Sequence, residues 1–162
     1  MRGRLATRDR LLSWGLNVPV NCLLCNAIPE SANHLLTECV FSSEIWSRLF
    51  HHQIFTLPTL IDEIVLWCYS ISGNSKLNTI SMLLVHATVY FLWKERNARL
   101  HSSVAKTTDA IIKEIHLLIR AKLFGLDRSL LNQTRLATSS SSSSALSQQD
   151  SFLSNWFAYF QV

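Results

Sequence analysis

The amino-acid sequence predicts a mostly α-helical fold with a small cysteine- and histidine-containing module, then a helical bundle or hairpin, then a disordered C-terminal tail. Three cysteines and a histidine lie close together in the first quarter of the chain. Apolar residues recur at helical spacing through the middle of the chain, and a run of six serines follows them. The expected boundaries are residues 1–55 for the module, 56–126 for the helical region and 127–162 for the tail.

The composition of the 162-residue chain fits one domain with a sizeable core. Hydrophobic residues make up 48% of the chain and charged residues 16%, and the mean hydropathy is +0.17. This apolar excess suggests surface meant for a partner or left exposed by missing sequence. The net charge of +4 permits a nucleic-acid partner without requiring one.

Residues 7–14 are expected to form a short helix, because Thr7 can cap it and Gly15 can end it in the left-handed conformation. The basic residues in and before this segment fit either a solvated helix face or a patch that contacts phosphates. A tryptophan beside them could stack on a base. The candidate nucleic-acid-binding residues are Arg2, Arg4, Arg8, Arg10 and Trp14.

The next segment contains four residues in the pattern C-x2-C-x8-H-x4-C, namely Cys22, Cys25, His34 and Cys39. Zinc takes four thiolate or imidazole ligands in a tetrahedron, and structural zinc sites often combine a close Cys-x-x-Cys pair with a distant second pair. We therefore expect these residues to bind one zinc ion (Zn2+) in a closed Cys3His site.

Three other roles are possible for the same cysteines. They could be ordinary buried small side chains. A disulfide is disfavoured because three cysteines cannot all pair among themselves and because no apolar run follows the N-terminal positive charges as it would in a secretory signal. A redox Cys-x-x-Cys would need a βαβ context, which the sequence does not indicate. Free thiols favour an intracellular location, nuclear or cytoplasmic, over a secreted one.

Helical signals follow the first cysteine pair. Ser31 is a candidate N-cap for a helix that carries His34 and ends near Cys39, which can close the tetrahedron. A second helix from about residue 43 is expected to cover the module. Trp46 lies in its apolar stripe, where a core position is favoured over base stacking.

The helical region is expected to contain a helix after Pro58, a long helix over residues 76–101 and an amphipathic helix over 107–124 that stops at Gly125. The last two should pack as a hairpin. Polar residues interrupt the most apolar stretch, 77–93, so a buried helix is favoured over a membrane span. Cys68 lacks a metal-type neighbour and is expected in the core.

Beyond Ala137 the serine run can bury nothing and predicts disorder. The aromatic tail over residues 152–162 is consistent with either a docking peptide or sequence without function.

The N-terminal residues carry a likeness to a known family. They are RGRLATRDRL at 2–11, Trp14-Gly15, Cys22-Leu23-Leu24-Cys25, Glu30-Ser31, His34-Leu35, Cys39 and Ile45-Trp46. This pattern resembles the zinc-binding domain that lies behind the reverse transcriptase of plant non-LTR (LINE-type) retroelements. The stretch WKERNAR at 93–99 looks like the segment that follows that domain.

The resemblance implies that Cys22, Cys25, His34 and Cys39 are the zinc ligands and that the module contacts RNA or DNA during copying of the element. The chain has no paired-aspartate polymerase motif and no spaced carboxylates for a two-metal nuclease. We therefore expect a non-enzyme without a small-molecule substrate, a fragment or domesticated remnant of the parent polyprotein. The alternatives are a protein-interaction scaffold with a purely structural zinc, acting through its apolar helices, and a remnant without selected function.

Overall fold

The computed structural model describes residues 5–102, 104–138 and 151–160. These residues form a mostly α-helical fold, as predicted, with a single isolated bridge between Asn21 and Pro29 as the β-type pairing within them. The elements in chain order are α1 (Arg8–Ser13), the π-helix η1 (His34–Glu38), α2 (Val40–Leu49), α3 (Ile61–Trp67), α4 (Ser75–His101), α5 (Thr108–Thr138) and α6 (Phe152–Tyr159).

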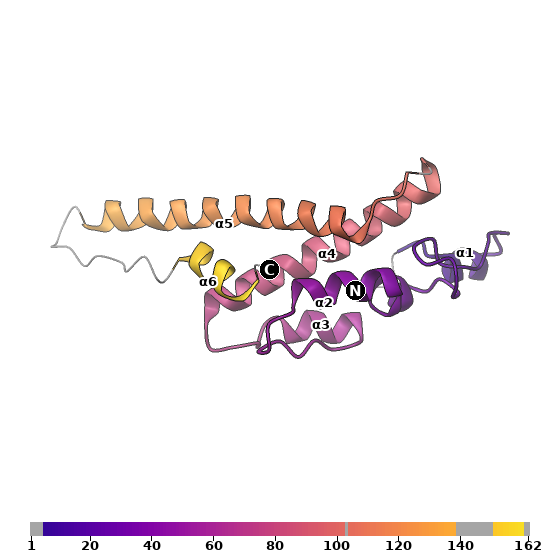
Figure 1. Cartoon of the computed structure of the whole chain (residues 1–162), viewed down its shortest axis with the longest axis horizontal. Helices are drawn as coiled ribbons and strands as arrows, with labels where there is room; N and C mark the ends of the chain where they lie inside the picture. Colours follow the sequence, from indigo (N-terminus) through magenta and orange to yellow (C-terminus); the bar gives the residue numbers. More distant parts are fainter. Residues whose placement is uncertain (1–4, 103, 139–150, 161–162) are drawn as a thin grey trace.

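The molecule is elongated, and its two long helices set its length (Figure 1). α4 and α5 pack against each other, which confirms the predicted pairing of these two helices. α6 packs on both of them, and α2 contacts both as well. α1 lies at one end of the molecule, beside the loop that carries the first cysteine pair (Figure 1).

One hydrophobic cluster runs through the described residues from the cysteine loop to α6. Trp46 is buried, and its indole Nε1 donates a hydrogen bond to the Leu36 carbonyl at 2.6 Å, so it is a core residue as expected. Phe50 packs its ring against Phe55, Trp67 and Phe160. The aromatic groups thus join the first half of the chain to its last helix. The division into residues 1–55 and 56–126 stays a prediction.

The ends of the first and fourth helices show how local sequence sets their limits. Gly15 has a φ of 79°, the left-handed conformation predicted for a residue that ends α1. Thr7 stands at the N-cap of that helix, but its side chain makes no capping hydrogen bond. Asn74 caps α4, because its Oδ1 accepts hydrogen bonds from the backbone N–H groups of Lys76 and Leu77.

The predicted stop at Gly125 is wrong. α5 continues through this residue to Thr138, since a single glycine inside a strongly periodic segment costs a helix only about 1 kcal/mol. Packing of the apolar stripe of α5 against α4 outweighs that cost. An added Cβ at Gly125 would meet no atom within 4 Å, so the position is an open helix surface.

The expectation of disorder from residue 127 onward is wrong for the described parts of the tail. Two features cap the N-terminus of α6. Ser151 and Ser154 form a capping box. The Asp127 carboxylate accepts the N–H groups of Phe152 and Leu153 at 2.8 and 3.0 Å. Trp156 and Phe160 are fully buried. Residues 139–150, which include the serine run, lie outside the described residues.

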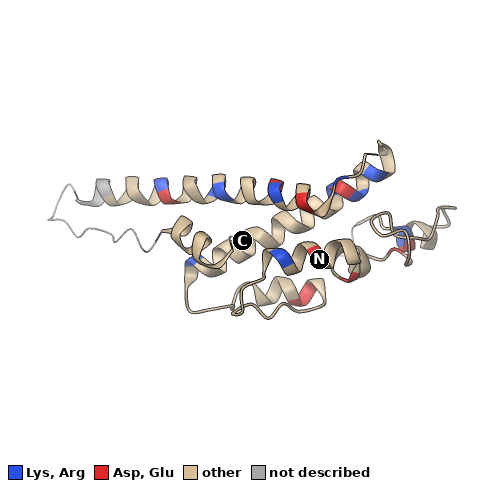
Figure 2. Cartoon of the chain, in the orientation of Figure 1, with Lys and Arg blue, Asp and Glu red and all other residues tan. Residues whose placement is uncertain are grey.

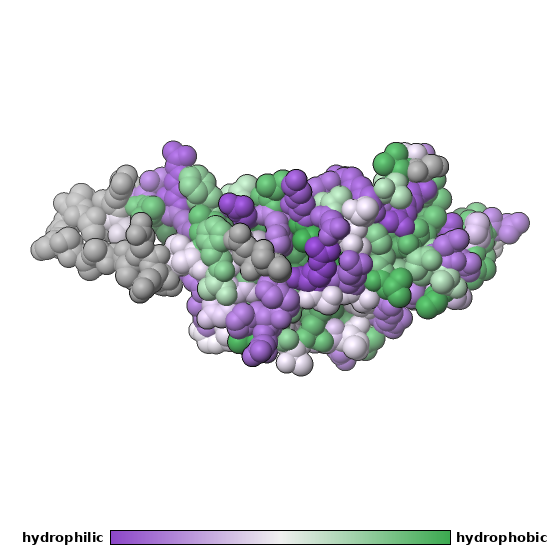
Figure 3. Space-filling view, viewed as in Figure 1, coloured by the Kyte–Doolittle hydropathy of each residue, from purple (hydrophilic) through white to green (hydrophobic). Residues whose placement is uncertain are grey.

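The charged side chains are spread over several helices, with basic bands along α5 (Figure 2). Apolar side chains are exposed as well (Figure 3). On α5, Leu117, Phe124 and Leu131 recur every seven residues and are 58%, 59% and 54% exposed. None of the helices in the described parts of the chain combines the length and the apolar character that crossing a membrane requires.

Candidate metal centre

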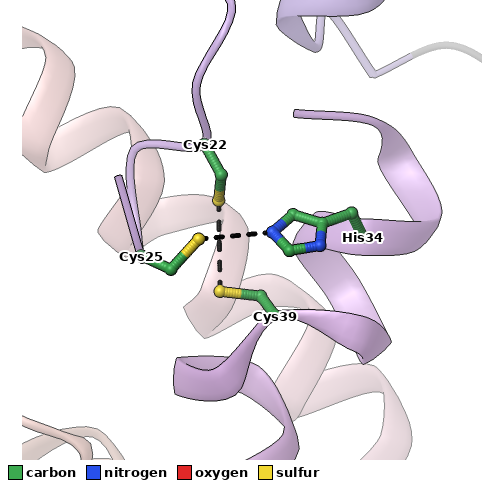
Figure 4. A group of neighbouring side chains, drawn as sticks. All are labelled: Cys22, Cys25, His34 and Cys39. Carbon is green, nitrogen blue, oxygen red and sulfur yellow. Dashed lines mark hydrogen bonds between the residues drawn. The ribbon is translucent and has the colours of Figure 1, made fainter. Parts of the chain in front are cut away.

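The side chains of Cys22, Cys25, His34 and Cys39 converge on one point (Figure 4). Their four ligand atoms all lie within 4.8 Å of one another. The two sulfurs of Cys22 and Cys39 are 4.0 Å apart, and Cys25 Sγ is 3.4 Å from His34 Nε2. A tetrahedral zinc with bonds of about 2.3 Å to sulfur and 2.0 Å to nitrogen has edges of about 3.8 Å and 3.5 Å between those atoms. The cluster therefore has the dimensions of a zinc site.

A tight turn positions the first ligand pair. The Cys22 N–H donates to the Ile28 carbonyl at 2.8 Å, and the Asn26 N–H donates back to the Cys22 carbonyl at 2.8 Å. Asn26 has a φ of 56°, a left-handed conformation that asparagine tolerates better than most residues. The Leu24 N–H lies 3.4 Å from Cys22 Sγ. An N–H donor at this place stabilises a thiolate ligand.

The second ligand pair is brought together by the π-helix η1. The Ser31 hydroxyl accepts the His34 N–H at 3.1 Å, so Ser31 caps this helical segment as predicted. An α-helix would place residues five apart about 140° from each other around its axis. Here the Cys39 N–H donates to the His34 carbonyl at 2.7 Å, an i to i+5 bond that brings the two residues onto one side. The wider turn of the π-helix therefore brings His34 and Cys39 close enough to complete the set of four side chains.

The contact between the two sulfurs of Cys22 and Cys39 shifts their pKa values in opposite directions. Hydrogen bonding from Cys39 lowers the pKa of Cys22 to about 5. The same contact, together with burial, raises the pKa of Cys39. A metal ion that binds both sulfurs must displace the remaining proton, which makes its affinity dependent on pH.

These four residues define a class of site: a largely buried Cys3His set whose three thiols and one imidazole can supply all four ligands of a tetrahedral zinc. Comparison with known families agrees with this class. Residues 1–46 match the model of the family described as zinc-binding in reverse transcriptase. The match supports a reverse transcriptase zinc-binding domain at this end of the chain, and the cluster fits a zinc ion. No curated protein and no solved structure gave a match.

The loop that carries Cys22 and Cys25, here called the zinc loop, is held to the helical core by Glu30. The residue pattern alone did not reveal this role. Its carboxylate is buried and accepts the N–H groups of Arg8 and Leu23 at 3.0 and 3.2 Å. It also forms an ion pair with Arg96 of α4, whose Nη2 lies 2.9 Å from Oε1 and whose side chain is 3% exposed. The available signal was the presence of both Glu30 and the stretch 93–99 in the family resemblance.

Arg99 makes a second connection between α4 and the first cysteine pair. Its Nη1 donates to the carbonyls of Leu23 and Leu24, the residues between Cys22 and Cys25, at 3.3 and 2.8 Å. Glu95 holds the Arg99 guanidinium at 2.8 Å. Two arginines of α4, Arg96 and Arg99, thus connect this helix to the zinc loop.

Of the predicted nucleic-acid-binding residues, the structure describes Arg8, Arg10 and Trp14. Arg2 and Arg4 lie outside the described residues. Arg8 is 8% exposed and donates to the Asn21 carbonyl, so it is a structural residue of the zinc loop and cannot offer its guanidinium to a phosphate. Arg10 and Trp14 remain together: the guanidinium carbon is 5.1 Å from the ring centroid, and Trp14 is 56% exposed.

Cys68 lies outside the ligand set. It is buried, its thiol donates to the Val65 carbonyl at 3.0 Å, and burial raises its pKa. This confirms its assignment to the core.

Proposed function

We propose that the chain is a non-catalytic zinc module whose metal fixes a loop against α1, and that α1 and its C-cap present Arg10 and Trp14 to RNA or DNA. The single observation that carries the proposal is the closed Cys3His cluster, whose ligand atoms lie within 4.8 Å of one another. Four protein ligands leave no position for a water or a substrate, which argues for a structural rather than a catalytic metal. The family resemblance supports an origin in a LINE-type retroelement of a plant.

Hydrogen bonds to Glu30 connect the zinc loop to α1, beside which the candidate contact residues lie. The Arg8 N–H binds the Glu30 side chain, and the Asp9 N–H binds the Glu30 carbonyl at 3.2 Å. These bonds fix the start of α1, the helix that precedes Trp14. An exposed indole with a guanidinium beside it is suited to stacking on a base while the cation meets a phosphate.

The contact can be tested by fluorescence anisotropy with a labelled single-stranded oligonucleotide. We expect Trp14→Ala to weaken binding about tenfold, because stacking of one base contributes about 1–3 kcal/mol. Tyr69→Ala is the matched control, since Tyr69 is 63% exposed but belongs to the segment after α3. Equal affinity of the two variants, or no binding by the wild type, would refute the nucleic-acid contact. Retained zinc in Trp14→Ala would show that the module itself is intact.

The same titration separates this function from the protein-interaction scaffold expected as the alternative. Phosphate contacts make affinity fall steeply with salt, whereas an apolar interface does not show that dependence. The exposed leucines and phenylalanine of α5 are the feature that the alternative would use.

A further inference from the structure

A hollow of about 450 Å³ lies between α2 and α5, away from the zinc ligands. Its polar lining consists of Arg48 from α2 and Asp109, Lys113, His116 and Arg120 from α5. The α5 residues follow the spacing i, i+4, i+7 and i+11, which places them on one face of the helix. Figure 2 shows basic bands on α5 and toward the C-terminal end of α2 on the same side of the molecule.

The hollow has an excess of positive charge. Two carboxylates bind one of its three cationic side chains: Arg48 pairs with Asp109 at 2.6 Å and with Glu44 at 3.5 Å, while Lys113 and Arg120 have no carboxylate partner within the described residues. Within the described residues Lys113 has no ion pair or hydrogen bond, and Arg120 has a ring contact alone, 5.7 Å from the Phe157 centroid. Arg48, Lys113 and Arg120 are all exposed, so their charged groups can reach a ligand from solvent. Figure 3 shows hydrophilic side chains gathered between α5 and α2.

His116 adds a polar group to the lining of the hollow. Its Nε2 is buried and has no hydrogen-bond partner within the described residues, although its ring packs edge-on against Trp156 at 5.2 Å. Burial lowers the pKa of His116, and the charges of Arg120, Arg48 and His51 lower it further. Leaving a buried nitrogen unpaired has a free-energy cost that a bound acceptor would remove.

We infer that this hollow is a phosphate-binding site, which a phosphodiester group of a nucleic-acid strand occupies. Arginine and lysine side chains around a half-open hollow suit a phosphate, whose several oxygens can accept from all of them at once. The half-buried imidazole of His116, whose Nε2 has no partner within the described residues, adds a ring nitrogen that can donate when protonated. The choice of a nucleic-acid strand as the occupant rests on the proposed function, whereas the phosphate chemistry of the hollow does not.

The test uses the zinc-loaded full chain and two charge-matched double variants. Lys113→Gln with Arg120→Gln removes two charges from the hollow. Lys122→Gln with Arg128→Gln removes two exposed charges from the same helix outside it. Two probes are titrated: a labelled oligothymidine over a range of salt, and inorganic pyrophosphate, with the imidazole resonance of His116 followed by NMR.

For the oligothymidine, we expect the hollow variant to flatten the plot of log affinity against log salt by about 1.4, since each lost single-strand contact removes about 0.7. The control variant should keep the wild-type slope. For pyrophosphate, binding should move the His116 resonance and raise the pKa of His116 in the wild type and the control, but not in the hollow variant.

The outcomes separate the two proposals. If the oligothymidine binds and loses affinity in Trp14→Ala but equally well to both double variants, the hollow inference is overturned while the proposed function stands. If pyrophosphate binds in the hollow but the oligothymidine does not bind at all, the phosphate site stands and its nucleic-acid occupant is refuted together with the proposed function. No response of His116 to either probe overturns the site itself.

Discussion

At the scale of single residues, Glu30 links the metal module to the rest of the molecule. Its carboxylate takes two backbone N–H groups and the guanidinium of Arg96, all in the protein interior. A charge taken out of water in this way is tolerable only while every partner is present. Arg8 belongs to the same network through its backbone N–H, while its buried guanidinium donates to the Asn21 carbonyl.

Glu30→Gln tests this network. The substitution keeps the size of the side chain but leaves the Arg96 charge buried without its counter-charge, so we expect a loss of about 3 kcal/mol or more in the free energy of unfolding, measured with urea in the presence of zinc. Glu44→Gln is the control, because Glu44 forms an ion pair with Arg48 at 3.5 Å but is half exposed and should cost about 1 kcal/mol at most. A similar small cost for both variants would contradict the structural role of Glu30.

The four members of the cysteine and histidine cluster could be named from the sequence because thiol and imidazole groups at this spacing have few other uses. The surrounding partners could not be named in that way. A buried ion pair between residues 66 positions apart leaves no local pattern, and both Glu30 and Arg96 look like ordinary polar residues beside apolar neighbours. Their role appears only once α4 is placed against the zinc loop.

At the scale of elements, capping residues predicted the N-cap at Ser31 and the end of α1 at Gly15. They could not predict the wide π-helical turn of η1. A π turn contains the same residue types as an α turn, and its stability comes from the contacts around it. Here those contacts include the Trp46 indole on the Leu36 carbonyl, from a helix later in the chain. Periodicity therefore placed the helix but could not give its width.

The two glycines at the ends of the predicted helices provide a matched pair of substitutions. Gly125 lies inside α5 with open space around it, so Gly125→Ala should raise the free energy of unfolding by about 1 kcal/mol. Gly15 has equally open surroundings but a φ of 79°, so Gly15→Ala should lower that free energy by about 1 kcal/mol. Chemical denaturation of both variants measures the difference. If Gly125→Ala is destabilising, α5 does not continue through this position.

At the scale of the whole molecule, the C-terminal helix completes the core. α6 was not predicted, because the serine run before it is typical of disorder. The short segment after the run has helical spacing of its own: Trp156 and Phe160 are four residues apart and both fully buried. The last described helix, α6, thus packs against α4 and α5.

Trp156→Ala tests whether the tail belongs to the folded core. Removing a fully buried indole should cost about 3–5 kcal/mol in the free energy of unfolding, from lost burial and the cavity left behind. Phe157→Ala is the neighbouring control, because this ring is 48% exposed and should cost far less. Thermal or urea unfolding of both variants measures the two losses in the free energy of unfolding. Wild-type stability in Trp156→Ala would mean that the tail does not pack as described.

One zinc ion should hold the N-terminal module in place, and the metal content of the purified chain tests this. Atomic emission after dialysis should give one zinc per molecule in the wild type and in Cys68→Ala, the cysteine outside the site, and a lower content in Cys25→Ser. A chelator should change the circular dichroism spectrum of the wild type. Metal-free wild-type protein whose spectrum is unchanged by the chelator would contradict the account.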